Sequence, residues 1–257
     1  MSYGICHLTA VPLRKEPSDK SEMTSQLLFG ETFEIIQKEE KWSMVTLSSD
    51  GYTGWIDNKQ YEEIESLPKT SAATVSAPLF VVQNGSGAFT FIPAGGQVYF
   101  NSPTEIVCGK STFKCGEQDG KNATSPAELA LGGMIFLGTP YLWGGKTLTG
   151  MDCSGFTQLV FKMNGKQIPR DAFQQAELGV PISFIDEAET GDLAFFDNSE
   201  GRITHVGIIL NQKELGTKSV IHASGQVRLD KIDHQGIFNE ETKSYSHQLR
   251  IIKRIDK

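Results

Sequence analysis

Several features that would assign this chain of 257 residues to a class at once are missing from it. It contains no run of about 18 consecutive apolar residues, the length needed to cross a membrane as a helix. Its opening, MSYGICHLTAVPLRKEPSDK, lacks the basic and apolar regions of a signal peptide. We therefore expect a cytoplasmic protein with no membrane partner, although a chain from which a signal peptide had been removed would look the same.

Positive charge is also scarce. The chain has 24 Lys and Arg against 31 Asp and Glu, a net charge of −7, and no basic run. Nucleic acids and anionic membrane surfaces are therefore poor partners. Its charged fraction of 21% and hydrophobic fraction of 39% are those of an ordinary globular protein, which we expect to be a monomer of two or three domains.

Cysteine is the third scarce feature. The four cysteines are too few for a disulfide framework in a chain of this length. No CxxC or HxxxH pair suggests a zinc site, so we expect neither a metal nor an organic cofactor. The informative feature is therefore a single cysteine at a position where a reaction would need a thiol.

The first half of the chain has the pattern of small all-β domains. Residues 1–65 contain short strands separated by Gly and Asp-Gly turns. The segments PLRKEPS, LLFGE, WSMV and DGYTGWI follow one another in the order of a bacterial SH3 domain, which this region resembles. Residues 66–122 begin with a Ser-, Thr- and Pro-rich stretch and then read as a second, divergent SH3-like barrel.

Residues 123–257 are predicted to form an α+β domain, with helices first and antiparallel strands after. Within it, DCSGFTQLVFKMNG predicts a short amphipathic helix that Asp152 caps. The spacing i, i+3, i+4, i+7 assigns four side chains to its buried face: Phe156, Leu159, Val160 and Met163.

Cys153 is the first residue of this predicted helix. Unpaired backbone N–H groups and the helix dipole at that position favour thiolate over thiol, which predicts a nucleophile. The alternative is a buried cysteine that packs as a small apolar side chain. The neighbouring residues are small and polar, namely Asp152, Ser154 and Gly155, and they favour the nucleophile.

Two histidines on neighbouring strands are the candidate partners of this thiol. RITHVGIIL and SVIHAS read as strands joined by a loop centred near residue 214.5. Antiparallel pairing across that centre sets position 205 opposite 224 and 207 opposite 222. His205 and His222 then lie diagonally on one face, about 7–8 Å apart at the backbone.

The remaining histidines have no such company, and we expect surface or capping roles for them: His7, His234 and His247. Residue type alone would also allow zinc to be bound by Cys153, His205 and His222, but no metal-binding spacing supports that reading.

Six segments in order, PYLWGG, DCSGF, PRDAFQQ, GDLAFF, HVGI and VIHAS, resemble the NlpC/P60 family of cell-wall cysteine peptidases, which have papain-like topology. The resemblance covers about residues 130–255. It implies that Cys153 is the nucleophile, His205 the base and His222 the third polar group that orients His205. It also implies that Tyr141 lies beside the nucleophile and helps to stabilise the oxyanion; the alternative is an aromatic side chain that packs the following glycine loop.

Members with SH3-like barrels in front of this domain resemble the γ-D-glutamyl-L-diamino acid endopeptidases, or dipeptidyl-peptidases of type VI. These cleave murein stem peptides that carry a free N-terminal L-alanine, such as a murein tripeptide. In such proteins the first barrel closes one end of the cleft, and an acidic residue there pairs with the substrate ammonium.

On this resemblance Glu22 and Tyr52 are candidates for the ammonium site, and Asp152 and Ser154 line the cleft from the catalytic side. The alternatives are a solvated turn acid for Glu22, a barrel aromatic for Tyr52 and a pure helix cap for Asp152.

The predicted function is hydrolysis of the γ-D-glutamyl-L-diamino acid bond in cell-wall peptide recycling. Three other functions stay open: an N-acetylmuramoyl-L-alanine amidase, a thiol acyltransferase, or a non-catalytic wall-binding SH3 protein. The sequence does not separate lysine from diaminopimelate as the preferred diamino acid.

Overall fold

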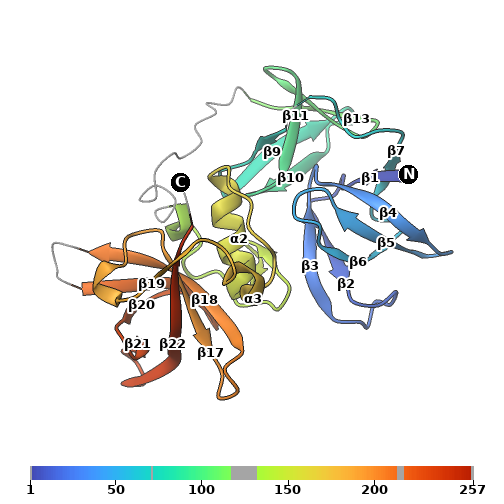
Figure 1. Cartoon of the computed structure of the whole chain (residues 1–257). Coiled ribbons are helices and arrows are strands. Elements are labelled where there is room, and N and C mark those ends of the chain that lie inside the picture. Colours follow the sequence, from blue (N-terminus) through green and yellow to red (C-terminus); the bar gives the residue numbers. More distant parts are fainter. Residues whose placement is uncertain (1, 71, 117–131, 213–216, 256–257) are drawn as a thin grey trace. The chain divides into compact units, whose positions relative to one another are not determined.

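The computed structural model describes residues 2–70, 72–116, 132–212 and 217–255 (Figure 1). The chain forms two compact units. The first comprises Met1–Asn122, Trp143–Leu148 and Gly165–Gln167, and the second comprises Ala123–Leu142, Thr149–Asn164 and Ile168–Lys257. Among the described residues, none of the helices has the length and hydropathy that a membrane crossing requires.

The first unit begins with a seven-stranded antiparallel sheet in the order β3-β2-β6-β5-β4-β1-β7. Buried and part-exposed residues alternate along its central strand β5, where Val45 and Leu47 point into the core. The strands are β1 (Ser2–Ile5), β2 (Ala10–Arg14), β3 (Met23–Leu28), β4 (Thr32–Lys38), β5 (Trp42–Leu47), β6 (Thr53–Asp57) and β7 (Glu62–Ile64). This part is all-β, as its sequence predicts.

A second sheet of the same unit has the order β10-β9-β13-β12-β11-β8. Its strands are β8 (Ala73–Thr74), β9 (Leu79–Asn84), β10 (Phe89–Pro93), β11 (Gln97–Ser102), β12 (Glu105–Cys108) and β13 (Ser111–Lys114). Ile5 of β1 and Phe29, in the turn after β3, belong to the core of the second sheet, and the Gln97 N–H donates to the Phe29 carbonyl over 2.7 Å. The two sheets thus share apolar packing within one unit.

The predicted domain boundaries remain predictions. A boundary after residue 65 separates two sheets but falls within the first compact unit. The boundary after residue 122 lies outside the described residues. The SH3-like assignment of the second sheet is likewise a prediction.

The second unit is organised around a seven-stranded antiparallel sheet in the order β16-β22-β17-β18-β19-β20-β21, and β21 also pairs with β22. The sheet strands are β16 (Val180–Ile182), β17 (Leu193–Asp197), β18 (Ile203–Gln212), β19 (Thr217–Ser224), β20 (Gln226–Ile232), β21 (Gly236–Asn239) and β22 (Ser244–Arg254). Its other elements are β15 (Gly150–Met151), α2 (Cys153–Met163), α3 (Ala172–Gln175) and the 3₁₀-helix η1 (Ile185–Glu187), and β14 (Lys146–Thr147) belongs to the first unit.

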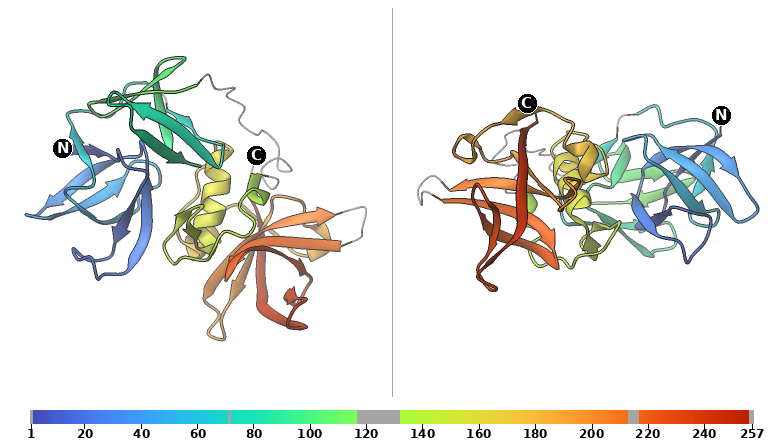
Figure 2. Two further views of the ribbon diagram at one scale, coloured as in Figure 1. Left: turned by 180° about the vertical axis from the view of Figure 1, so that it is seen from behind. Right: turned by 60° about the horizontal axis from the view of Figure 1, so that its bottom comes forward.

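Helix α2 is formed and capped as predicted. The Asp152 carboxylate accepts a hydrogen bond from the Gly155 N–H over 2.7 Å, and all four predicted apolar side chains are buried. The helix packs on β18 and β19 (Figures 1 and 2). This packing fixes the residue at the head of the helix beside the centre of the sheet.

The register between β18 and β19 is the predicted one. Ile208 pairs with Ile221 and Ile209 with Val220, which sets position 207 opposite His222. Gly207 is required there, because a Cβ atom on it would lie only 2.9 Å from the His222 Cβ and 2.5 Å from a Val220 methyl group. The missing side chain gives the His222 ring room on the face that it shares with His205.

Candidate active site

Cys153 lies at the junction of α2 and β18. It is the first residue of the helix, and its side chain is buried. The backbone N–H groups of Ser154 and Val206 approach the sulfur closely enough to stabilise its charged form. Val206 follows His205 on β18, so the thiol lies against the strand segment that carries the imidazole.

The expectation that the helix start lowers the pKa of this thiol was wrong. Burial, followed by the negative charge of Asp152, raises the pKa of Cys153 to about 11. The N–H groups of Val206 and Ser154 and the charge of Arg170 act in the opposite direction and are outweighed. The helix dipole and the adjacent N–H groups can be read from the sequence, whereas the loss of solvent depends on the tertiary packing. The resting protein therefore holds a protonated thiol at neutral pH.

His205 and His222 meet directly in the buried part of the sheet. His205 Nε2 and His222 Nδ1 are 2.7 Å apart, and the rings are nearly perpendicular at 84°. Burial, followed by the charges of His222 and His247, lowers the pKa of His205 well below 6.5. His205 is therefore neutral and able to accept a proton, so the resting partners are a neutral thiol and a neutral imidazole.

An acidic residue that the sequence reasoning missed extends this chain of contacts. Asp230 on β20 places Oδ2 2.9 Å from His222 Nε2. Arg228 donates to the same carboxylate through Nε over 2.6 Å and Nη2 over 3.0 Å. The sequence did contain a signal for Asp230. Symmetric pairing across the tight turn at Gly225 sets Arg228 opposite His222, and Asp230, two residues further along, lies on the same face of the sheet as His222.

His247 also belongs to this cluster, so its predicted surface or capping role was wrong. Its ring stacks on that of His205 with centroids 4.2 Å apart and an interplanar angle of 25°. Burial, followed by the charge of His222, lowers the pKa of His247 to about 4. His247 lies on β22, which is distant in sequence from β18. Pairing of β22 with β21 brings its ring to the site.

Tyr141 lies close enough to Cys153 and Asp152 to respond to their charges. Burial, followed by those two charges, raises the pKa of Tyr141 to about 12. Its backbone N–H donates to the Gly225 carbonyl over 2.9 Å. The phenol therefore keeps its proton and remains a hydrogen-bond donor beside the thiol.

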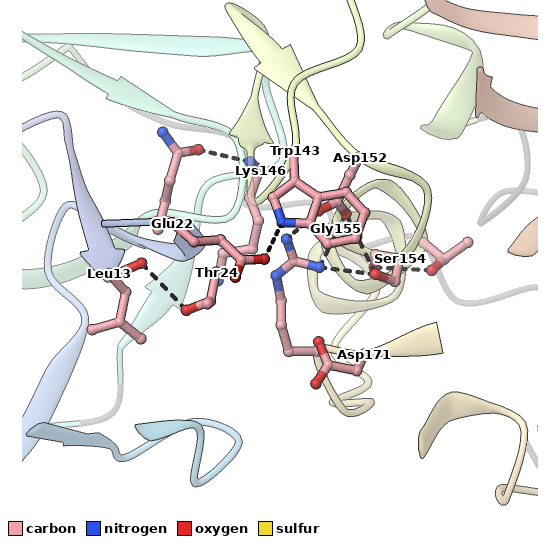
Figure 3. A network of polar contacts seen from close by, with 12 residues as sticks. Leu13, Glu22, Thr24, Trp143, Lys146, Asp152, Ser154, Gly155 and Asp171 are labelled. Atoms are coloured by element: carbon pink, nitrogen blue, oxygen red, sulfur yellow. Dashed lines mark hydrogen bonds and ion pairs between the residues drawn. The ribbon is translucent and has the colours of Figure 1, made fainter. Parts of the chain in front are cut away.

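Asp152 and Ser154 are held by a buried arginine (Figure 3). Arg170 is only 2% exposed, and it donates to the two Asp152 oxygens over 3.0 and 2.6 Å and to Ser154 Oγ over 2.9 Å. Asp152 is thus a helix cap and an ion-pair partner at once. Any substrate ammonium that binds Asp152 must share this carboxylate with Arg170, whose role the sequence reasoning did not identify.

Glu22 and Tyr52 belong to the first unit. The Trp143 indole donates to Glu22 Oε1 over 2.8 Å (Figure 3), and the Lys15 ammonium lies 3.6 Å from Glu22 Oε2. Tyr52 packs against the core of the first sheet. The structure groups Cys153 with the histidines, Tyr141, Asp152 and Ser154 in the second unit. A common site that includes Glu22 and Tyr52 stays a prediction.

Two parts of the chain match known families. Residues 138–246 match the NlpC/P60 family, and residues 13–60 match the bacterial dipeptidyl-peptidase Sh3 domain. The gamma-D-glutamyl-L-lysine dipeptidyl-peptidase of Bacillus subtilis (strain 168) is 32% identical over 206 residues, which are 72% of this chain and 68% of that protein. A protein of the same name from Bacillus cereus (strain ATCC 10987 / NRS 248) is 25% identical over 238 residues, which are 80% of this chain and 68% of that protein.

The fold agrees with these matches. The crystal structure of a NlpC/P60 family protein from Bacillus cereus ATCC 10987 has a TM-score of 0.78, with coverage of 98% of this chain and 99% of that chain, at 18% identity. A cysteine at a helix start, against a strand whose imidazole is held by a second imidazole, is the arrangement expected of a cysteine peptidase. The chain belongs to the NlpC/P60 family of peptidases and carries a bacterial SH3 domain in its first part.

Removing the Arg170 guanidinium should destabilise the protein strongly. Arg170→Ala leaves the buried Asp152 carboxylate without its charged partner, and we expect a loss of about 3–5 kcal/mol in the free energy of unfolding. The control is Arg202→Ala, which breaks an exposed pair with Glu200 and should change that free energy by less than about 1 kcal/mol. Urea denaturation measures both, and equal losses would contradict the buried-pair interpretation.

Stability should fall as the pH is lowered from about 6.5 towards 4. The folded-state pKa of His247 is about 4 and its ordinary value is 6.5, so between these values the unfolded chain binds the proton first. The contribution is complete above the ordinary value and is lost as pH falls through the window, by at most about 1.4 kcal/mol per pH unit for one histidine. His247→Gln should flatten the curve from urea denaturation. His234→Gln, at an exposed position, should leave it unchanged, and an unaltered slope in His247→Gln would contradict the assignment.

Proposed function

We propose that this protein is a cysteine endopeptidase that hydrolyses the γ-D-glutamyl-L-diamino acid bond of murein stem peptides with a free N-terminal L-alanine. The observation that carries the proposal is the buried contact of His205 with His222 on the strand whose Val206 N–H approaches the sulfur of Cys153. The choice of substrate is supported by the similarity to two proteins named gamma-D-glutamyl-L-lysine dipeptidyl-peptidase. We propose that this activity serves cell-wall peptide recycling. We also propose that the protein acts as a monomer and that its catalytic domain has papain-like topology.

The proposed reaction starts from the neutral pair. The Cys153 sulfur attacks the γ-carbonyl of D-glutamate while its proton passes to His205, which gives a tetrahedral oxyanion and an imidazolium. The backbone N–H of Cys153 and the Tyr141 hydroxyl stabilise the oxyanion. His205 then donates the proton to the leaving amine of the diamino acid, and a thioester remains.

Water completes the turnover. His205, neutral again, takes a proton from the water molecule that attacks the thioester carbonyl. Collapse of the second tetrahedral intermediate returns the proton to the sulfur and releases L-Ala-D-Glu. Each step moves a proton between Cys153, His205 and the substrate, and none requires a redox partner.

We propose Glu22 as the group that selects a free amine. Trp143 orients its carboxylate with an indole hydrogen bond of 2.8 Å to Oε1. The other oxygen faces the Lys15 ammonium at 3.6 Å, and the Lys15 side chain is 66% exposed, so water screens that pair. A substrate ammonium can compete for this oxygen, whereas an acylated amine offers no charge to pair. Tyr52, Asp152 and Ser154 complete the proposed substrate site.

The proposed activity should be specific for the free peptide. We expect wild-type protein to cleave L-Ala-γ-D-Glu-diaminopimelate or its lysine analogue, release L-Ala-D-Glu, and leave the N-acetylated peptide and intact muropeptide uncut. Cys153→Ala should abolish the cleavage, because the sulfur forms the acyl intermediate. Mass spectrometry of the products measures all of these outcomes.

The same assay separates the other functions. Release of stem peptides from sacculi would indicate an amidase, and transfer of the acyl group to an added amine would indicate an acyltransferase. Unchanged peptides in every incubation would indicate a wall-binding protein without this activity. Each of these results would overturn the proposal.

Neutralising Glu22 should weaken binding of the free amine. With Glu22→Gln we expect KM for the free peptide to rise about tenfold, the equivalent of about 1.4 kcal/mol, while kcat changes little. Glu63→Gln is the matched control, because Glu63 is a half-exposed acid of the same sheet that pairs with Lys38. Steady-state kinetics measure both variants, and an unchanged KM in Glu22→Gln would remove Glu22 from the site.

A further inference from the structure

The Asp230 carboxylate contacts His222 on the side away from His205, where it can influence the proposed reaction. Three adjacent strands, β18, β19 and β20, place His205, His222 and Asp230 on one face of the sheet. All three side chains are buried, with exposed fractions of 6%, 1% and 7%. Their nitrogen and oxygen atoms follow one another at 2.7 and 2.9 Å, so the three side chains form a continuous hydrogen-bonded chain from His205 to Asp230.

Asp230 is held in its ionised form. Burial acts to raise its pKa, but the hydrogen bonds from His222 and Arg228 and their charges prevail and lower it. Arg228 binds both carboxylate oxygens, with Nε on Oδ2 and Nη2 on Oδ1. An ionised carboxylate only accepts hydrogen bonds, so His222 Nε2, 2.9 Å from Oδ2, must be the nitrogen that carries a proton.

This proton determines the states of both rings. While His222 carries this one proton, on Nε2, its Nδ1 presents a lone pair. His205 Nε2, which is 2.7 Å from that lone pair, must then be the donor, and His205 Nδ1 is left with the lone pair that can accept a proton. The stacking of His247 on His205 uses the face of the ring and does not compete for these in-plane atoms.

We propose that Asp230 is a positioning residue that sets the tautomers of His222 and His205, so that Nδ1 of His205 is the atom that takes the proton of Cys153. Arg228 contributes to this positioning, because its contacts with both carboxylate oxygens fix the orientation of the group that His222 Nε2 contacts. The inference rests on the proposed roles of Cys153 and His205 but not on the identity of the peptide substrate.

The same contacts matter when His205 becomes charged. After the thiol proton reaches His205 Nδ1, both nitrogens of that ring carry protons, and Nε2 donates a charge-assisted hydrogen bond to His222 Nδ1. In the proposed arrangement His222 keeps its single proton on Nε2, towards Asp230. The carboxylate thus stabilises the imidazolium through an intervening ring, without any proton transfer to Asp230.

Asp230→Ala should release the whole chain. His222 Nε2 and Arg228 Nε both contact Oδ2 in the wild type, so removing the carboxylate removes the acceptor that holds the His222 proton on Nε2. His222 can then carry its proton on Nδ1, which makes His205 accept at Nε2 and carry its own proton on Nδ1. In that state His205 cannot act as the base.

The direct test is the tautomer of each ring by ¹⁵N–¹H correlation spectroscopy of the imidazole nitrogens in the full-length protein at neutral pH. In the wild type we expect His222 and His205 both to be protonated at Nε2, and in Asp230→Ala a large share of both rings to be protonated at Nδ1. A wild-type His222 protonated at Nδ1 overturns the proposal, and this result does not depend on whether any variant folds.

Kinetics supply the second readout. For Asp230→Ala we expect kcat on the cleaved peptide to fall by on the order of 10²-fold with little change in KM, a smaller drop than the roughly 10⁴-fold one caused by the Asp→Asn exchange in the serine-protease triad, where the acid contacts the base directly. The matched control is Asp192→Ala, because Asp192 is also buried and binds two nitrogens of an arginine, Arg254, away from the histidines. Asp192→Ala should lose stability but keep kcat.

Failure of this inference can be distinguished from failure of the proposed function. If wild-type protein cleaves no murein peptide, the substrate proposal fails, while the tautomers and the rate of Cys153 alkylation by iodoacetamide still test Asp230. Alkylation near neutral pH should slow in Asp230→Ala, since His205 no longer accepts the thiol proton. If Asp230→Ala keeps wild-type tautomers, or loses kcat only as much as Asp192→Ala does, Asp230 is a structural residue and the proposal is wrong.

Discussion

The site depends on the packing of the head of α2 against β18. This contact removes Cys153 from solvent and sets its sulfur beside the backbone of Val206, next to His205. Burial raises the pKa of the thiol and lowers that of His205, so the low-dielectric environment disfavours the charged form of each partner. The proposed reaction therefore begins from a neutral pair, and charge develops in it only when a substrate carbonyl accepts the sulfur.

Two arginines fix the polar groups that surround the buried thiol of Cys153 and the imidazole of His205. Arg170 holds Asp152 and Ser154 at the start of α2, and Arg228 holds Asp230 behind the histidines. Each guanidinium engages both oxygens of one carboxylate, a contact with directional as well as electrostatic strength. The cysteine is thus fixed from one side and the histidine chain from the other.

Local patterns in the sequence were sufficient for the elements that carry the reactive groups. A good cap followed by an amphipathic spacing defines α2, because both signals lie within a few residues of each other. The loop centred near residue 214.5 defines the β18–β19 register, because strict alternation leaves one pairing in which Gly207 and His222 face each other. The all-β character of the first 65 residues likewise follows from closely spaced turn signals.

The sequence by itself determined which residues are chemically able to act, where the helix begins and how two strands pair, since these depend on neighbours in the chain. Only the tertiary structure decided the ionisation of Cys153, the place of His247 and the partners of Asp230 and Asp152. Those properties depend on burial and on contacts between distant segments, such as β22 with β21, and solvent exclusion changes the energy of a charge more than a helix dipole does.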